Sequence, residues 1–404
     1  MTIEKGGPEV RGETGILRRV IVHAPDQSHE LLLPKNVQGK SKDYLLMDDI
    51  LFVSRAQQEH QILAKILETT AEVFYFRNLL AEVLADERVR KEALKMAGLE
   101  GKRGIPEDPV KLADTLLSGQ IEGRKLFHPA PNLIFTRDIA AVVGKSIVLS
   151  YAATFSEYTI NRPREREMAL MRMIIKNHAL FSNYNIIDVN AGIKKEVSCE
   201  GGDIQVVNGR TAMVGVSERT KDKAARQLAT HLFGDGFEYV LKVKLPIGRA
   251  TMHLDTVITM LSPQECVVHE GVIGKNFTVT VMTPSREDEY KGGLLPILAD
   301  LGVNLQAYSC GGGDPIKATR EQWTDGANLM AIAPGVVVGY DRNIATASCL
   351  RERGGFEILT ADEYLVNPDP YIMGGKKVLI LIPSGELSRG RGGPRCLSLP
   401  LARD

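Results

Sequence analysis

The chain has 404 residues, of which 44% are hydrophobic and 25% are charged, as is typical of an ordinary globular protein. Its 50 basic and 50 acidic residues cancel, so no basic excess indicates binding to nucleic acid or to an anionic membrane. The apolar runs are too short to span a bilayer, no signal peptide is visible, and the five cysteines have no CxxC spacing, which fits a reducing compartment. We therefore expect a soluble, cytoplasmic protein without nucleic-acid or membrane partners.

Strand-like segments recur along the chain, and most of them are followed by a segment with the apolar spacing of a helix. The first strand is expected at residues 17–23. Two-stranded hairpins with short turns are expected at 132–150, 200–216, 253–269 and 328–340; the Asn208-Gly209 turn is a strong hairpin signal. Helices are expected at 56–68, 163–182, 221–233, 292–301 and 346–353.

This repetition predicts an α/β fold in which strand-rich units are arranged radially around an axis, as in propellers. A doubly wound parallel sheet is the alternative, because strands that alternate with helices also produce that architecture. The short hairpin turns count against it. Residues 79–127 do not follow the repeat, since they are helical in pattern and highly charged. We expect them to form a small helical insert within a single domain that covers residues 1–404.

Residues that can carry chemistry stand where the predicted strands begin. Asp138, Glu200, and the pair His253 and Asp255 each open one of the hairpin units, and Cys396 lies near the end of the sequence. Carboxylates bind a cation, a histidine transfers protons, and a thiolate attacks carbon. In a radial fold these side chains would converge at one end of the axis.

Each of these residues also has a purely structural interpretation. Asp138 can cap a turn or pair with the arginine before it, and the Glu-Gly-Gly-Asp sequence at 200–203 can form a polar turn. His253 and Asp255 share one face of a strand, and that face can point to solvent as well as into a pocket.

A metal-binding site and a phosphate-binding site are two more specific alternatives for these residues and for the glycine-rich segment. The chain has no HExxH motif and no paired histidines or cysteines at ligand spacing, so a metal site is disfavoured. The Gly311-Gly312-Gly313-Asp314 sequence lacks both the GxxxxGK[ST] frame and the GxGxxG spacing of phosphate-binding loops.

Cys396 lies in a segment rich in glycine and arginine, Arg389 to Pro400. Cationic neighbours lower the pKa of a thiol and favour the reactive thiolate, so this setting predicts a nucleophile with a lowered pKa. The alternative is a small buried apolar residue in a last strand, which is how most free cysteines behave.

Taken in order, the motifs resemble the arginine deiminase family of the guanidine-modifying superfamily. The matching segments are Met47-Asp48-Asp49-Ile50, Arg55 to His60, Pro131 to Asp138, Glu200-Gly201-Gly202-Asp203, Gly215 to Thr220, Met252 to Val257, Arg320 to Trp323, Ala331 to Val336, Tyr340 to Asn343 and Arg389 to Ser398. The resemblance implies a five-bladed α/β propeller that hydrolyses L-arginine with water to L-citrulline and ammonia. It implies no metal and no organic cofactor, and we expect a homo-oligomer.

The resemblance also implies a role for particular residues. Cys396 would attack the guanidinium carbon and form a covalent S-alkylthiouronium, and His253 would act as general acid and then general base. Asp138 and Asp255 would hold the guanidinium, and Glu200 would contact it and orient His253. The residues implied for substrate binding are Asn132, Arg164 and Arg219 at the backbone end of the substrate, Arg391 on the loop before the thiol, and Phe135 along the aliphatic part.

Two segments depart from the family pattern, because the insert at 79–127 is shorter than usual and the segment 367–382 is longer. Related activities remain as alternatives, namely an amidinotransferase, an agmatine deiminase or a dimethylarginine hydrolase. Agmatine has no carboxylate, so the arginines at 164, 219 and 391 argue against it. An alternative of a different class is a non-catalytic arginine-binding propeller, which the presence of all five catalytic matches disfavours.

Overall fold

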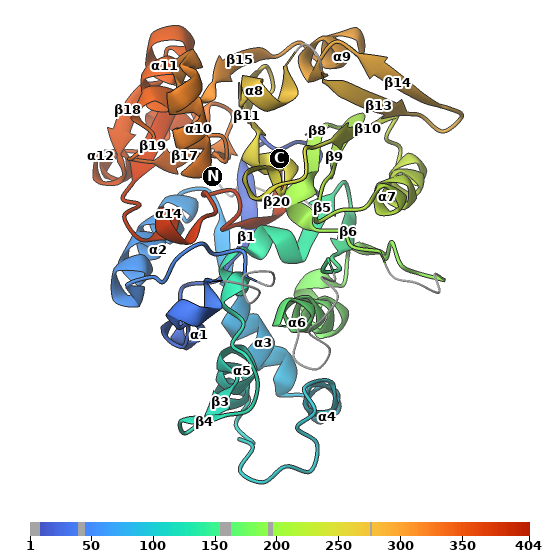
Figure 1. Ribbon diagram of the computed structural model, residues 1–404, viewed down its shortest axis with the longest axis vertical. Coiled ribbons are helices and arrows are strands. Elements are labelled where there is room, and N and C mark those ends of the chain that lie inside the picture. The colour runs from blue at the N-terminus through green and yellow to red at the C-terminus, as the bar shows by residue number, and fades with distance from the viewer. Residues whose placement is uncertain (1–8, 39–44, 154–162, 193–196, 275–276) are drawn as a thin grey trace.

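The computed structural model describes residues 9–38, 45–153, 163–192, 197–274 and 277–404 (Figure 1). Within these ranges the strands form five sheets of three to five strands and one two-stranded hairpin. The chain is therefore an α/β protein, and its strands do not join into one continuous parallel sheet. The doubly wound alternative is wrong for the described residues.

The sheets share one order of elements. An antiparallel strand pair is followed by a helix, and the next strand then lies parallel to one strand of the pair. In one of them β5 (Ala140–Val143) pairs with β6 (Ser146–Leu149), α6 (Pro163–Asn177) follows, and β7 (Asn185–Ile187) lies parallel to β6. A parallel strand requires such a crossover, and here the helix provides it.

The next three sheets follow the same order. The second contains β8 (Ile204–Asn208), β9 (Thr211–Val216), α7 (Asp222–Gly234) and β10 (Tyr239–Lys244), and it is extended by β13 (Thr278–Met282) and β14 (Glu287–Lys291). The third contains β11 (Ile258–Ser262), β12 (Glu265–Val268), α8 (Glu270–Ile273), α9 (Leu294–Asp300) and β15 (Gln306–Ser309). The fourth contains β16 (Met330–Ala333), β17 (Val336–Tyr340), α11 (Ile344–Gly354), β18 (Glu357–Thr360), α12 (Ala361–Val366) and β19 (Val378–Ile382).

The remaining sheet of this kind joins the two ends of the chain. β1 (Leu17–Val22) pairs antiparallel with β20 (Leu399–Arg403), and after α2 (Val53–Leu67) it pairs in parallel with β2 (Glu72–Tyr75). Both β1 and β20 lie near the middle of the molecule (Figure 1). The last strand begins at Leu399, shortly after Cys396, so this sheet anchors the segment that carries the thiol.

A helical group lies at one end of the molecule (Figure 1). It consists of α3 (Phe76–Leu84), α4 (Glu87–Met96), α5 (Pro109–Ser118) and the hairpin of β3 (Gln120–Ile121) with β4 (Arg124–Lys125). The local signals for α5 are clear, because the Asp108 side chain accepts from Lys111 N, a proline opens the helix, and Gly119 ends it at φ 73°. The apolar faces of these helices belong to the same core cluster as β5 and β6.

The predicted helices and hairpins are confirmed, but the hairpin expected at 132–150 begins only with β5 at Ala140. The expectation that Asp138, His253 and Asp255 stand on strands is wrong, because short 3-10 turns precede β5 and β11. The sequence did not predict the parallel return strands or the 3-10 turns before the hairpins. Further short elements are α1 (Gln27–Glu30), α10 (Pro315–Trp323), α13 (Asp369–Ile372) and α14 (Leu387–Gly390). None of the helices in the described ranges has the length and apolar character needed to cross a membrane.

Candidate active site

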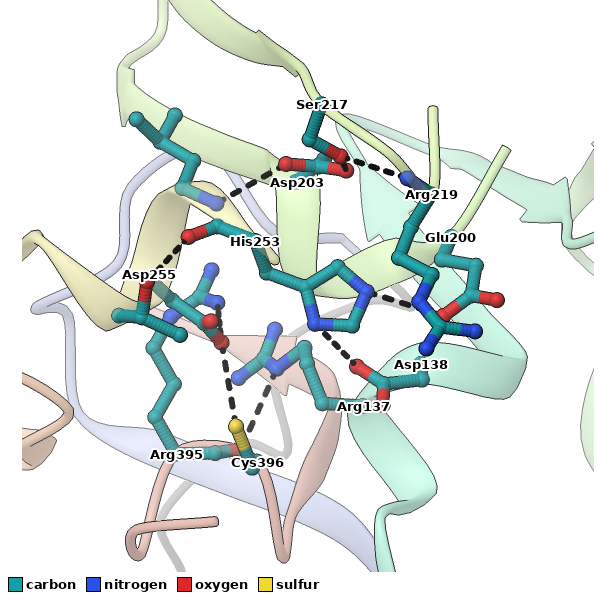
Figure 2. A network of polar contacts seen from close by, with 12 residues as sticks. Arg137, Asp138, Glu200, Asp203, Ser217, Arg219, His253, Asp255, Arg395 and Cys396 are labelled. Atoms are coloured by element: carbon teal, nitrogen blue, oxygen red, sulfur yellow. Dashed lines mark hydrogen bonds and ion pairs between the residues drawn. The ribbon is translucent and has the colours of Figure 1, made fainter. Parts of the chain in front are cut away.

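Three short 3-10 turns, each placed just before the first strand of a sheet, hold most of the predicted catalytic residues. Asp138 lies in the turn Thr136–Ile139 before β5, and Glu200 precedes the turn Gly201–Asp203 before β8. His253 precedes the turn Leu254–Thr256 before β11, and Asp255 lies inside it. The turns pack against one another, so residues from three sheets meet at one place (Figure 2).

Glycines permit this close packing. A Cβ at position 201 would lie 2.1 Å from the carbonyl oxygen of Arg137. A Cβ at position 202 would lie 2.8 Å from Asp138 Oδ1 and 2.8 Å from His253 Cγ. Contacts this short do not occur, so the glycines at 201 and 202 are required for the approach of the three turns.

His253 lies between two carboxylates at the centre of the site (Figure 2). Its Nε2 is 2.9 Å from Glu200 Oε2, and its Nδ1 is 3.7 Å from Asp138 Oδ1. Burial lowers the pKa of His253, but the nearby carboxylates of Asp138 and Glu200 outweigh burial and raise the pKa to about 10. The imidazole is therefore protonated at neutral pH and can donate a proton.

The guanidinium of Arg164 lies against the same carboxylates. Its Nη2 is 2.7 Å from Glu200 Oε2 and 3.3 Å from Asp138 Oδ2, and its Nη1 is 3.3 Å from Glu167 Oε2. All four side chains are almost completely buried. Because a buried carboxylate requires a cationic partner, this cluster is suited to hold a planar, positively charged group.

Cys396 is fixed by its own backbone. Its N–H donates to Asn328 Oδ1 at 3.0 Å, and its carbonyl accepts from the N–H of Arg137 at 3.1 Å. The thiol donates to Asp255 Oδ2 at an Sγ–O distance of 3.6 Å (Figure 2). The nucleophile predicted from the sequence therefore lies beside one of the two carboxylates predicted to hold the substrate.

The expectation that neighbouring arginines give the thiol a lowered pKa is wrong for the structure described. Burial raises the pKa of Cys396 well above its ordinary value, and the carboxylates of Asp255, Asp138 and Asp325 raise it further. The guanidinium of Arg395 opposes them. The other arginines are engaged elsewhere: Arg389 pairs with Asp49 and Glu386, and Arg391 pairs with Asp48.

Three carboxylate oxygens of the site residues accept no hydrogen bond from any described residue. They are Asp138 Oδ1, Glu200 Oε1 and Asp255 Oδ1, and all three are buried. Buried acceptors of this kind are costly and rare in folded proteins, so they indicate a site made for hydrogen-bond donors.

The predicted substrate-binding residues lie around this centre. Asn132 accepts from Leu46 N at 2.7 Å and donates to Glu167 Oε1 at 3.1 Å. Arg219 extends beside Glu200 (Figure 2). Phe135 lies under the thiol loop, where a Cβ at Gly392 would be 2.3 Å from its ring.

Arg391 lies away from the carboxylate cluster. Its Nη1 is 3.3 Å from Asp48 Oδ2, and its guanidinium carbon is 4.1 Å from the centre of the Trp323 ring. Its backbone has φ 72°, a left-handed conformation that is uncommon outside glycine.

Several residues of the site were not assigned a role from the sequence. Asp203 accepts from Leu254 N at 2.9 Å and from the Ser217 hydroxyl at 2.7 Å, and thereby fixes the His253 turn to the Glu200 turn. Asn328 donates from Nδ2 to the carbonyl of Asp255 at 3.0 Å. Asp203 ends the Glu-Gly-Gly-Asp motif that begins at Glu200, so the sequence provided a reason to consider it. No local motif marks Asn328, because its contacts are to residues distant in the sequence.

The donor atoms of Asp138, Glu200 and His253 lie within 4.8 Å of one another, which is close enough to bind a metal ion. Two of these three residues are bonded to the Arg164 guanidinium. The cluster could hold either a metal ion or a guanidinium, so the absence of a metal stays a prediction.

Comparison with known structures defines the class of fold. The chain is similar to an amidinotransferase from Microseira wollei of the saxitoxin biosynthetic pathway, with a TM-score of 0.58, 14% identity, and coverage of 98% of this chain and 97% of that one. It is also similar to AgrE in a complex with L-arginine, with a TM-score of 0.53 and 15% identity. That match covers 96% of this chain but only 40% of AgrE. The chain thus shares the α/β fold of these two proteins.

Sequence comparison gives the family itself. The family profile described as arginine deiminase matches residues 43–118 and 106–403. An arginine deiminase from Bacillus cytotoxicus is 34% identical over 441 aligned positions, which cover 98% of both chains. The chain belongs to the arginine deiminase family.

Proposed function

We propose that the protein hydrolyses the guanidino group of L-arginine to L-citrulline and ammonia through a covalent intermediate on Cys396. The observation that carries this proposal is the guanidinium of Arg164, which is bonded to Asp138 and Glu200 beside His253. The site thus already binds the group that arginine presents. Full-length relatives named arginine deiminases support the same reaction.

In the proposed substrate complex, the guanidinium of arginine takes the place of the Arg164 guanidinium. Its N–H groups donate to the free oxygens of Asp138 and Asp255, and Glu200 contacts it from the side of His253. Two carboxylates select a cation over a neutral urea, so the citrulline product is held less tightly than the substrate.

The first half-reaction transfers the amidino group to sulfur. The bound cation offsets the charges of Asp138 and Asp255, so the Cys396 thiol releases its proton to water and becomes the thiolate. This proton finally leaves with the ammonia as ammonium. The thiolate attacks the guanidinium carbon, a C–S bond forms, and the C=N π electrons move to nitrogen. Protonated His253 gives its proton to one terminal nitrogen, the C–N bond breaks, and ammonia leaves an S-alkylthiouronium on Cys396.

The second half-reaction uses the neutral imidazole produced by the first. His253 takes a proton from water as its oxygen bonds to the thiouronium carbon. The C–S bond then breaks with its electron pair on sulfur, the hydroxyl proton passes to this thiolate, and citrulline is released. Cys396 and protonated His253 are thereby restored.

Recognition of the amino-acid end is proposed for five residues. Once displaced, Arg164 turns with Arg219 and Arg391 towards the substrate α-carboxylate. The two oxygens of this carboxylate can each accept a hydrogen bond from a guanidinium. Asn132 contacts the backbone end, and Phe135 lines the aliphatic chain; both are buried near the site.

The chemistry described needs no metal and no organic cofactor. We expect a chelator to leave citrulline release unchanged, because every proton transfer and bond change is assigned to Cys396, His253 or water. The measurement is turnover after dialysis against a chelator, with metal content read by mass spectrometry. Lost activity that a divalent metal restores would assign the His253 cluster to a metal instead.

The decisive experiment compares substrates. The protein is incubated with L-arginine, agmatine, methylated arginines, and arginine plus glycine, and products are identified by mass. Citrulline and ammonia from arginine alone support the proposal, whereas a new amidino compound from arginine plus glycine would indicate an amidinotransferase. Cys396→Ala should bind arginine but release no citrulline. Full turnover by this variant would exclude the assigned nucleophile.

We also propose the finer architecture and setting. The five sheets are interpreted as five blades of an α/β propeller, in a single domain of residues 1–404 with a helical insert at 79–127. Their common order of elements supports this interpretation. A cytoplasmic homo-oligomer is expected from the composition and the resemblance, and analytical ultracentrifugation and cell fractionation test these two expectations.

A further inference from the structure

Arg395, the residue before the nucleophile, is a completely buried arginine with carboxylates on two sides. Its Nη1 donates to Asp255 Oδ2 at 2.8 Å. Its Nε donates to Glu13 Oε2 and its Nη2 to Glu13 Oε1, each at 3.1 Å. Nη2 also donates to the carbonyl of Ile204 at 2.9 Å. The guanidinium is thus held by a two-point ion pair to Glu13 and directed at Asp255.

Glu13 is itself fixed to a strand. Its N–H donates to the carbonyl of Val206, and its Oε1 accepts from Val206 N at 3.2 Å. Burial raises the pKa of Glu13, but Arg395 and Arg137 outweigh burial and lower it to about 2. Glu13 is therefore charged throughout the physiological range and provides a permanent partner for Arg395.

The hydrogen bond from Arg395 restrains the carboxylate of Asp255. Its Oδ2 accepts from both Arg395 and the Cys396 thiol, while its Oδ1 accepts from no described residue. Arg395 and the thiol therefore hold the same oxygen of Asp255, and Oδ1 is left as the oxygen available to a ligand (Figure 2). A carboxylate without this partner would be free to turn, and a small misplacement near the reacting carbon is costly for the rate.

We propose that Arg395, anchored by Glu13, is a positioning residue that orients Asp255 for the guanidinium and opposes the negative field at the Cys396 thiol. This inference rests on the proposed function, since it assigns Asp255 to the substrate. The charged and titratable groups described around Arg395 and the thiol are Asp255, Asp138, Asp325, His253, Glu13, Arg137, Arg403 and Tyr340. Of the arginines that act on Glu13, only Arg395 is bonded to Asp255.

Arg403 offers a matched control. It is also buried, also acts on Glu13, and donates to the carbonyls of Gly15 and Ala331 at 2.7 and 2.8 Å. It is bonded neither to Asp255 nor to Cys396. Replacing it removes a comparable buried arginine without touching the reacting groups.

The experiment measures two quantities in Arg395→Lys, Arg395→Gln and Arg403→Lys: kcat for arginine per folded molecule, and the pH midpoint of Cys396 alkylation by iodoacetamide. We expect Arg395→Lys to lose about 100-fold in kcat through misplacement of Asp255, and Arg403→Lys to lose far less. Loss of the positive charge in Arg395→Gln should move the alkylation midpoint up by about one pH unit. A purely structural role would lower the folded fraction and leave this midpoint unchanged.

Equal kcat losses in Arg395→Lys and Arg403→Lys, or an unchanged midpoint in folded Arg395→Gln, would overturn the proposal. If Arg395→Gln does not fold, the comparison of the two lysine variants decides. If neither Arg395 variant folds, Glu13→Gln decides, because it keeps Arg395 and removes its anchor; an unchanged kcat there would exclude the proposed role. Alkylation does not need turnover, so a wild-type protein that releases no citrulline would refute the proposed function separately.

Discussion

His253 lies between Glu200 and Asp138, and each of these carboxylates also contacts the Arg164 guanidinium. These four side chains are two cations and two anions, and all four are buried. Replacing the Arg164 guanidinium by that of a substrate conserves this balance. Substrate binding then avoids the large cost of burying an uncompensated charge.

The raised pKa of His253 has a consequence for stability. The folded pKa of about 10 lies above the ordinary value of 6.5, so the stabilisation is fully present below pH 6.5 and is lost as pH rises through about 10. We expect the free-energy difference between wild type and His253→Gln to shrink by up to ~1.4 kcal/mol per pH unit across this window.

Urea unfolding at intervals from pH 6 to pH 10 measures this difference. His231→Gln, which changes an exposed histidine of α7, is the control and should give no such trend. Curves for wild type and His253→Gln that run parallel over the whole range would show that the imidazole gains nothing from its carboxylate partners.

At the scale of elements, the site depends on how closely the 3-10 turns approach one another. Gly202→Ala would place a Cβ 2.8 Å from both Asp138 Oδ1 and His253 Cγ, so one of the turns must move. We expect a kcat about 100-fold lower, because the reacting groups lose their alignment. The measurements are kcat and the melting temperature.

Gly209→Ala is the matched control on the same sheet. Its added Cβ would meet only the side chain of Arg11, at 3.8 Å, and its kcat should equal that of the wild type. A Gly202→Ala variant with normal turnover would show that the turns have room to separate without loss of geometry.

The elements also show what the sequence predicts and what it does not. The hairpins were predictable, because alternating apolar residues and turns such as Asn208-Gly209 act over a few positions. The 3-10 turns were not, since three residues are too few to show a period. The same limit applies to the site: Cys396 and His253 stand in recognisable motifs, but Arg395 contacts Glu13 across 382 positions. No local pattern encodes such a contact.

At the scale of the whole molecule, the sheet of β1, β2 and β20 holds the thiol segment in place. Every residue of β20 is buried, and Val20 in β1 pairs with Pro400. Deleting residues 399–404 should abolish both citrulline release and cooperative unfolding, because β1 loses an entire partner strand and its buried apolar contacts.

Circular dichroism during heating and a citrulline assay check this expectation. Deletion of Asp404 alone is the control, since it removes an exposed ion pair with Arg18 that contributes at most about 1 kcal/mol. A truncated chain that still melts cooperatively and turns over arginine would mean that β20 is dispensable for the site.

The pairing of β1 with β20 also sets an order of events during translation. β1 leaves the ribosome early, but its antiparallel partner is synthesised about 20 to 80 s later at ordinary elongation rates. Until then one edge of β1 is unpaired. Because an unpaired strand edge can pair with another chain, the nascent chain is prone to aggregate during this interval. The nucleophile arrives with the same late segment. The histidine and the carboxylates of the site, at positions 138 to 255, are therefore synthesised before the nucleophile, and arginine is consumed only when the two ends of the sheet meet.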